Sequence, residues 1–338
     1  MLNIGIIQMQ ATPLKVEENL SLAESLIVRT AKEGAQLVVL PEMFNVGYYL
    51  GEELMTVAET LAAGRTVTWL KSQAARYGIY IVTSLYERYE GHFYNTMVMV
   101  GSEGSLQHYR KRNPALSEVA VWRRSPVPGP GIFDTPLGRV GGAICFDSFT
   151  RETFEGFKRS AVELVVVVAC WGVPRPARRR LDMQLALPIL RLSQNLASEV
   201  MPYQYATQLN VPVVFVNQGG MTRTPGPVPP PYPWPLPPVE YEFHGNSHVR
   251  DASGQVLVRA GSADPAFSAV VAVDAQPAKV RPEITRVDIP PRYLSADYYF
   301  VQSPRQGKFW QFLGNLMQEW GMRGLQQEYE ARRARHIN

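Results

Sequence analysis

The chain has 338 residues, of which 46% are hydrophobic and 19% are charged, a composition typical of a globular protein with one large or two ordinary domains. Lys and Arg number 34 against 30 Asp and Glu, and the resulting net charge of +4 is too small to indicate a nucleic-acid partner. The two cysteines, Cys145 and Cys170, are expected to be free thiols in a reducing compartment, because a domain of this size does not need a single disulfide.

The N-terminal residues indicate a strand and not a targeting segment. Residues 1–8 lack the basic start and the small-residue cleavage site of a signal peptide. No stretch approaches the roughly 18 uncharged apolar residues of a membrane-spanning helix. We therefore expect a cytoplasmic protein without a membrane partner.

Short β-branched runs alternate with amphipathic segments along the first two thirds of the chain. The segments in chain order are strand Ile4–Met9, helix Val16–Glu33, strand Leu37–Leu40, helix Thr66–Tyr77, strands Ile79–Tyr86, Tyr94–Val100, Leu106–Arg110 and Gly138–Cys145, helix Thr150–Ser160, and strands Leu164–Ala169 and Val211–Val216. This alternation, with fully apolar strands, favours an α/β fold whose sheets are covered by helices.

The last third has a different composition. Thr224–Pro238 is dominated by proline and is predicted to be an inserted surface loop. Short strands are predicted at Ser247–Asp251, Gln255–Arg259 and Phe267–Val273, followed by a polar helix over about Lys308–Arg335. No internal repeat or clear linker is present before about residue 275, which indicates one domain.

Cys145 stands where a glycine-bearing strand meets the start of a helix. Such a turn lifts a side chain out of the sheet, and a helix N-terminus favours a thiolate over a thiol. The backbone N–H of Phe146 is then placed to face a developing oxyanion. Taken alone, the segment is equally compatible with a small buried cysteine that only packs.

Glu42 and Lys111 each follow a predicted strand, where α/β proteins commonly place ligand-binding groups. Taken singly, a solvated loop glutamate and an exposed charge run are the simpler interpretations of these two positions.

Three segments, taken in order, resemble the motifs of the nitrilase superfamily, the carbon–nitrogen hydrolases with a Glu-Lys-Cys triad. The matching segments are Leu40–Tyr48, Tyr109–Lys111 and Gly142–Asp147 with the closing Glu152, and weaker matches follow at Asn3–Gln8, Tyr94–Thr96, Val214–Asn217, Gly245–Ser247 and Asp251–Gly254. The resemblance covers roughly residues 1–275. It implies an α/β fold built as a four-layer αββα sandwich, with residues 276–338 as a C-terminal extension that packs on the domain or on a partner subunit.

The resemblance also implies the chemistry. Glu42 is the general base, Cys145 the nucleophile that forms a thioester, and Lys111 the cation that stabilises the oxyanion together with the Phe146 amide. Glu118 is the candidate for the second active-site glutamate that many relatives carry. No metal or cofactor is expected, since Gly245-Asn246 argues against a helix that would pair His244 with His248.

Several residues bear on the substrate. Tyr48 and Trp171 are expected to line the substrate site, although Trp171 is equally well interpreted as a core residue. Phe149 stands where relatives carry an arginine that binds acidic substrates, so acidic substrates are disfavoured. Phe146-Asp147 resembles the amidase-like branches and favours an amide over a nitrile.

The predicted function is therefore hydrolysis of a small amide with release of ammonia. A nitrilase or N-carbamoyl hydrolase with the same triad, an acyl transferase, and a catalytically silent binding protein remain alternatives. The family resemblance further implies a homodimer or larger homo-oligomer. The basic insert Pro174–Pro202 and the proline-rich loop are candidates to cover the substrate site or to meet another subunit.

Overall fold

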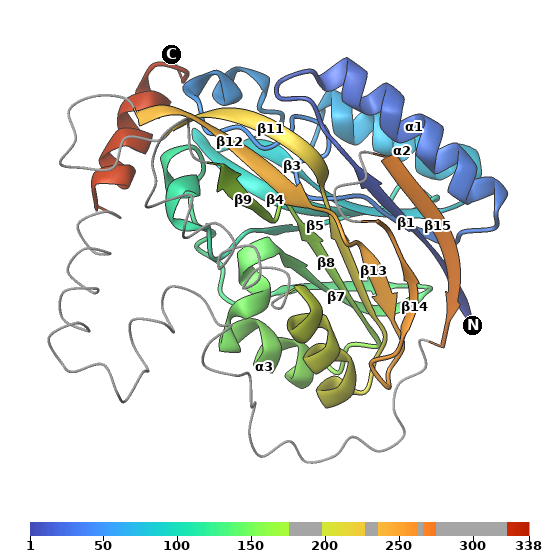
Figure 1. Cartoon of the computed structure of the whole chain (residues 1–338). Coiled ribbons are helices and arrows are strands. Elements are labelled where there is room, and N and C mark those ends of the chain that lie inside the picture. The colour runs from blue at the N-terminus through green and yellow to red at the C-terminus, as the bar shows by residue number, and fades with distance from the viewer. Residues whose placement is uncertain (176–197, 227–235, 262–265, 275–322, 338) are drawn as a thin grey trace, which may run out of the picture.

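Two six-stranded sheets lie face to face in the computed structural model, which describes residues 1–175, 198–226, 236–261, 266–274 and 323–337 (Figure 1). Sheet A has the order β15 (Ala266–Val273), β1 (Leu2–Met9), β2 (Leu37–Val39), β3 (Tyr80–Tyr89), β4 (His92–Val100), β5 (Leu106–Arg110). Sheet B has the order β14 (Val256–Arg259), β13 (His248–Arg250), β10 (Val213–Asn217), β8 (Leu164–Ala169), β7 (Gly138–Ile144), β6 (Gly131–Thr135).

Strand β8 shows why these strands are apolar on both faces. Leu164, Val166 and Val168 pack into the core between the two sheets. The alternate residues Val165 and Val167 pack into a second core on the outer face of sheet B. Because successive side chains of a strand point to opposite faces, a strand buried on both faces needs an unbroken apolar run.

Helices cover the outer face of each sheet. On sheet A, α1 (Val16–Lys32) buries an i, i+3, i+4 stripe that includes Val16, Leu20, Ala23 and Ile27, and α2 (Arg65–Tyr77) packs beside it. On sheet B, α3 (Arg151–Arg159) and the helical residues 198–209 contribute Phe154, Phe157, Met201 and Tyr205 to the outer core. The layers are therefore helix, sheet, sheet and helix, which confirms the predicted αββα sandwich.

A third, three-stranded sheet was not predicted. Its order is β11 (Gly219–Gly226), β12 (Leu236–His244), β9 (Gly172–Arg175). The prediction of a surface loop over Thr224–Pro238 is wrong at both ends, because residues 224–226 and 236–238 are strand residues. Proline is tolerated there because β11 is an edge strand and the register shifts between Thr224 and Gly226, opposite the prolines of β12. Residues 227–235 lie outside the described residues.

Two other predicted segments are only partly described. Of the basic insert 174–202, residues 174–175 end β9 and 198–202 begin the helix that runs to residue 209, while 176–197 lie outside the described residues. Of the polar helix predicted over 308–335, residues 323–334 are helical. The domain boundary near residue 275 falls at the start of 275–322, which are also not described. Within the described part of the chain, no helix is long and apolar enough to cross a membrane.

Candidate active site

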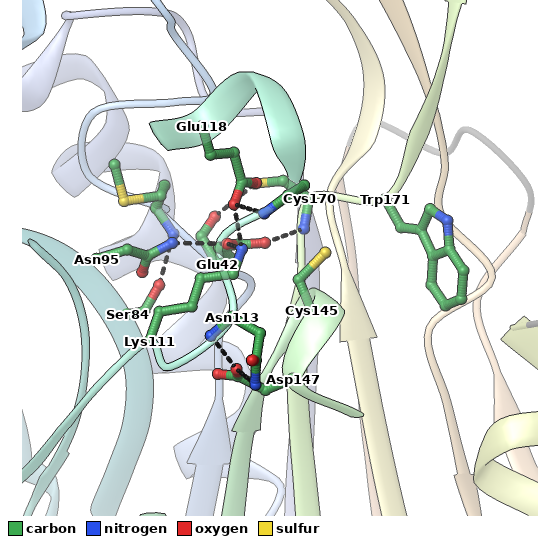
Figure 2. A network of polar contacts seen from close by, with 12 residues as sticks. Glu42, Ser84, Asn95, Lys111, Asn113, Glu118, Cys145, Asp147, Cys170 and Trp171 are labelled. Atoms are coloured by element: carbon green, nitrogen blue, oxygen red, sulfur yellow. Dashed lines mark hydrogen bonds and ion pairs between the residues drawn. The ribbon is translucent and has the colours of Figure 1, made fainter. Parts of the chain in front are cut away.

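Glu42 lies just beyond the C-terminal end of β2 and is fully buried. Its Oε1 accepts hydrogen bonds from Asn95 Nδ2 at 2.6 Å and from Lys111 Nζ at 2.8 Å, and its Oε2 accepts one from the backbone N–H of Cys170 at 2.7 Å. These donors come from β4, from the end of β5 and from the end of β8. The Glu42 carboxylate therefore accepts hydrogen bonds from segments of both sheets (Figure 2).

Lys111 is the buried cation of the site. Its Nζ lies 2.8 Å from Glu42 Oε1 and 2.7 Å from Glu118 Oε2, and all three side chains are at most 2% exposed. Glu118 belongs to the short 3₁₀ helix η2 (Leu116–Ala120), where its Oε2 also accepts the backbone N–H of Ala115 at 2.8 Å. A single ammonium thus sits between two carboxylates, and Nζ also lies 5.8 Å from the ring centroid of Trp122.

Burial and ion pairing have opposite effects on the pKa of Lys111. Burial by itself would lower the pKa of Lys111, but Glu118 and Glu42 outweigh it and hold that pKa well above its usual value. Burial raises the pKa of Glu118 to about 7, against the opposing effect of the Lys111 charge. Lys111 therefore remains an ammonium at neutral pH, while Glu118 is close to its titration point.

Cys145 occupies a strained turn between β7 and the 3₁₀ helix η3 (Cys145–Phe149), with φ at +47°. A non-glycine residue at positive φ is uncommon and is often found at functional sites. The preceding strand needs glycine, because a Cβ on Gly142 would lie 2.5 Å from Met97 Sδ and equally close to Phe133. The structure therefore contains the sharp strand-to-helix turn predicted at Cys145.

Cys145 is a partly exposed residue, and its thiol is close enough to Glu42 and Lys111 for their charges to act on it. Burial, followed by the Glu42 charge, raises its pKa well above the usual value, and this outweighs the opposing effects of Lys111 and the backbone N–H of Cys170. Burial thus opposes the thiolate that the helix N-terminus was predicted to favour. Because the pKa of the thiol is raised, a nearby base is needed to take the proton.

Asp147 joins the cysteine turn to the segment that follows Lys111. This buried carboxylate accepts hydrogen bonds from Tyr109 Oη at 2.9 Å, from the backbone N–H of Asn113 at 2.7 Å and from Asn113 Nδ2 at 2.9 Å. These hydrogen bonds connect the segment of Cys145 to the segment of Lys111.

Aromatic side chains lie on the other side of Cys145. The rings of Phe149 and Trp171 meet edge to face with centroids 4.7 Å apart, and Phe146 packs 6.2 Å from Phe149. Figure 2 shows Trp171 across Cys145 from Glu42 and Lys111. Phe146 and Trp171 are both partly exposed, as Cys145 is. The oxyanion role of Phe146 and the substrate contacts of Phe149 and Trp171 stay predictions.

Tyr48 lies in the hydrophobic core. It is 5% exposed and its ring meets those of Trp122, Tyr241 and Phe243 at angles near perpendicular, with centroids 5.4 to 6.5 Å apart. The described contacts of Tyr48 are thus packing contacts, one of them with Trp122, which also lies against Lys111. The substrate role of Tyr48 stays a prediction.

Sequence reasoning assigned no role to two groups that hold Glu42. Asn95 is a buried amide in an apolar strand, which is a signal for a functional position, but its contact with Glu42 depends on the β2–β3 and β3–β4 registers. Cys170 was predicted to be a free thiol, and it is one. Its Sγ donates to the Glu42 carbonyl oxygen at 3.0 Å, and its backbone N–H donates to the Glu42 carboxylate. A backbone contact of this kind leaves no sequence signal.

No group of three or more His, Cys, Asp or Glu side chains suited to a metal ion occurs among the described residues.

The comparisons with known proteins agree with this geometry. The family model for carbon–nitrogen hydrolases matches residues 3–281, so the chain belongs to the carbon–nitrogen hydrolase family, and the resemblance found in the sequence is confirmed.

Individual relatives match over shorter stretches. A nitrilase of Pyrococcus abyssi is 37% identical over 155 residues, which cover 45% of this chain and 59% of the relative. The omega-amidase NIT2-B of Xenopus laevis is 31% identical over 173 residues, covering 48% and 61% respectively. The chain thus spans about three fifths of the length of these curated relatives.

Two solved structures share the fold. A CN-hydrolase superfamily protein from Xanthomonas campestris, which carries an arsenic adduct in its active site, has a TM-score of 0.62 at 21% identity, covering 80% of this chain and 90% of its own. A mutant of the amidase from Nesterenkonia AN1 has a TM-score of 0.62 at 19% identity, covering 80% and 89%.

Proposed function

We propose that this chain hydrolyses the carbon–nitrogen bond of a small amide through a thioester on Cys145 and releases ammonia. The observation that carries the proposal is one buried ammonium, Lys111, held between Glu42 and Glu118 beside a partly exposed thiol at a positive-φ turn. A base, a fixed cation and a nucleophile are the groups that acyl transfer from nitrogen to sulfur requires.

In the first half of the reaction, Glu42 takes the thiol proton as Cys145 Sγ forms a bond to the amide carbon. Lys111 and the Phe146 backbone N–H stabilise the negative charge that develops on the carbonyl oxygen. Glu42 then gives its proton to the leaving nitrogen, the carbon–nitrogen bond breaks, and ammonia departs. The raised pKa of the Cys145 thiol explains why a base must act during the attack.

In the second half, Glu42 takes a proton from water as the water oxygen attacks the thioester carbon. The carbon–sulfur bond breaks, and the proton returns to the Cys145 sulfur as the carboxylic acid leaves. Glu118 stays on Lys111 throughout and is a positioning residue.

We prefer an amide substrate over a nitrile because of the two residues that follow the nucleophile, Phe146 and Asp147. The relatives include both a nitrilase and an omega-amidase, so nitriles belong in the test. An N-carbamoyl substrate would react through the same groups.

The test combines product formation with trapping. Ammonia release is measured across small aliphatic and aryl amides, N-carbamoyl compounds and nitriles, and intact mass spectrometry looks for an acyl adduct on Cys145. We expect an amide to give ammonia and a transient adduct in the wild-type protein, and neither in Cys145→Ala. Cys170→Ala is the matched control, because it keeps the backbone N–H that binds Glu42. Full turnover by Cys145→Ala would refute the mechanism.

Added nucleophiles separate the alternatives from other classes. With an amine or alcohol acceptor in the reaction, an acyl transferase gives mainly the acyl-transfer product, whereas a hydrolase still gives mainly the acid. A binding protein gives no product and no adduct with any compound of the screen. We further propose a homodimer or larger homo-oligomer, which light scattering on the purified chain measures.

A further inference from the structure

The C-terminal helix, residues 323–334, lies outside the residues that the family model matches and packs against the active-site segments. Figure 1 shows it in red next to the C-terminus. Its buried face presents Leu325, Tyr329 and Arg332, which are 2%, 3% and 8% exposed. Burial of an arginine and a tyrosine on one face of this helix indicates a specific docking site.

The first contact reaches the segment of Glu118. Leu325 forms a small hydrophobic cluster with Val119 and Ala120, the two residues that follow Glu118 in η2. A 3₁₀ helix of this length has few hydrogen bonds of its own, so its position depends on what packs against it. Leu325 therefore covers the short segment that aims the Glu118 carboxylate at Lys111.

The second contact reaches the residues just after η2. Tyr329 Oη accepts the backbone N–H of Phe93 at 3.1 Å, and the ring of Phe93 stacks on Tyr86 at 5.7 Å. Tyr86 Oη in turn donates to the carbonyl oxygen of Val121, and the carbonyl oxygen of Phe93 accepts the backbone N–H of Arg123 at 2.8 Å. Tyr329 thus supports the chain on the other side of Glu118.

The third contact reaches the segment that follows Glu42. Arg332 Nη1 donates to the carbonyl oxygen of Leu50 at 2.7 Å, and Arg335 Nε donates to Glu52 Oε2 at 2.8 Å. Leu50 belongs to the segment Glu42–Leu50, which follows β2. One helix therefore contacts both segments whose carboxylates hold Lys111.

We propose that the C-terminal helix is a positioning element of the active site, which sets the Glu118 segment against the Glu42 segment so that both carboxylates engage Lys111. Leu325 is its main positioning residue. The kinetic test of this proposal rests on the proposed function, because it measures turnover. A second test measures the reactivity of the Cys145 thiol and does not need turnover.

The experiment uses point variants of the full chain. Leu325→Ala removes the contact with Val119 and Ala120, Leu325→Met conserves its volume, and Leu257→Ala trims a leucine of β14 that is 38% exposed. Tyr329→Phe, which loses only one hydroxyl, is the second test if Leu325→Ala does not fold. Urea unfolding establishes that each variant is folded at the assay temperature.

We expect Leu325→Ala to lose about tenfold to hundredfold in kcat, with KM changed by less than about threefold, because a small misplacement of catalytic groups costs rate more than binding. Leu325→Met and Leu257→Ala should stay within about twofold of wild type. A folded Leu325→Ala protein with wild-type kcat would overturn the proposal, and so would an equal loss in Leu257→Ala.

The rate of Cys145 alkylation by iodoacetamide, measured against pH, distinguishes failure of this proposal from failure of the proposed function. If no compound is turned over by any variant, Leu325→Ala should still shift the pH midpoint of alkylation relative to Leu325→Met, because the Lys111 charge acts on the thiol. Identical alkylation profiles in folded proteins would overturn the proposal even then.

Discussion

Asp147 and Asn113 are joined by two hydrogen bonds, in which Asp147 Oδ1 accepts the backbone N–H of Asn113 at 2.7 Å and Asn113 Nδ2 at 2.9 Å. Asp147 stands two residues after Cys145, and Asn113 two residues after Lys111. The pair therefore fixes the nucleophile and the cation relative to each other, although neither residue is assigned a chemical step.

Replacing Asp147 by Asn should lower both stability and rate. The change leaves buried donors of Asn113 and Tyr109 without a charged acceptor, which costs about 1–3 kcal/mol in the free energy of unfolding. Displacement of Lys111 should lower kcat by about tenfold or more. Urea unfolding and steady-state kinetics measure the two effects.

The matched control is Asp134→Asn, whose carboxylate is 69% exposed and pairs with the exposed Arg139. This variant should stay within about 0.5 kcal/mol of wild type. Equal effects of the two substitutions would show that Asp147 does not fix Lys111 relative to Cys145.

The titration of Glu118 should appear in the pH dependence of stability. Its pKa is about 7 in the folded chain against an ordinary value of 4.5, so the folded state keeps a proton that the unfolded state loses. The stabilisation from this proton is complete below pH 4.5 and is lost as the pH rises to about 7. Relative to Glu118→Gln, which cannot titrate, the wild-type free energy of unfolding should therefore decline across this interval.

Urea unfolding of both proteins at closely spaced pH values measures this difference. Two curves that remain parallel from pH 4.5 to 7 would mean that Glu118 is ionised throughout, with Lys111 outweighing burial.

The two cysteines should differ in reactivity with iodoacetamide. Cys145 is partly exposed, whereas Cys170 is 7% exposed with its Sγ hydrogen-bonded to the Glu42 carbonyl oxygen. We expect one label per folded chain, located on Cys145 by peptide mass analysis, and a rate that rises with pH beyond the usual thiol range because the pKa is raised. Preferential labelling of Cys170 would contradict the burial of that thiol.

Tyr48→Ala should mainly lower the free energy of unfolding. Its ring packs against Trp122, Tyr241 and Phe243, so truncation should cost about 3–5 kcal/mol in the free energy of unfolding. Tyr48→Phe keeps the ring and should retain most of that stability. If Tyr48→Phe instead raised KM strongly with stability unchanged, Tyr48 would be a substrate-binding residue, as the motif predicts.

The sequence was sufficient for the layers and for the three residues that the structure brings together at the candidate site. Apolar runs such as Leu164–Ala169 predict buried strands, and the motifs around Glu42, Lys111 and Cys145 lie at the ends of strands that the structure brings together. These features are local, so they leave a pattern in the residues.

The remaining features depend on pairing between distant segments. The contact of Asn95 with Glu42 needs the β2–β3 and β3–β4 registers, and the contact of the Cys170 backbone needs sheet B beside sheet A. The strands at Thr224–Gly226 and Leu236–Pro238 form despite their prolines. The protonated resting state of Cys145 depends on burial, which the turn sequence does not encode.

The pairing of β1 with β15 has a consequence for synthesis of the chain. Leu2–Met9 is antiparallel along its whole length to Ala266–Val273, which is synthesised much later, so sheet A stays open at that side until Ala266–Val273 has been made. Until then a strand rich in isoleucine has an unpaired edge, the kind of surface that nascent chains expose to aggregation and to chaperones. Fragments that end before residue 266 should therefore aggregate even though they contain Glu42, Lys111 and Cys145.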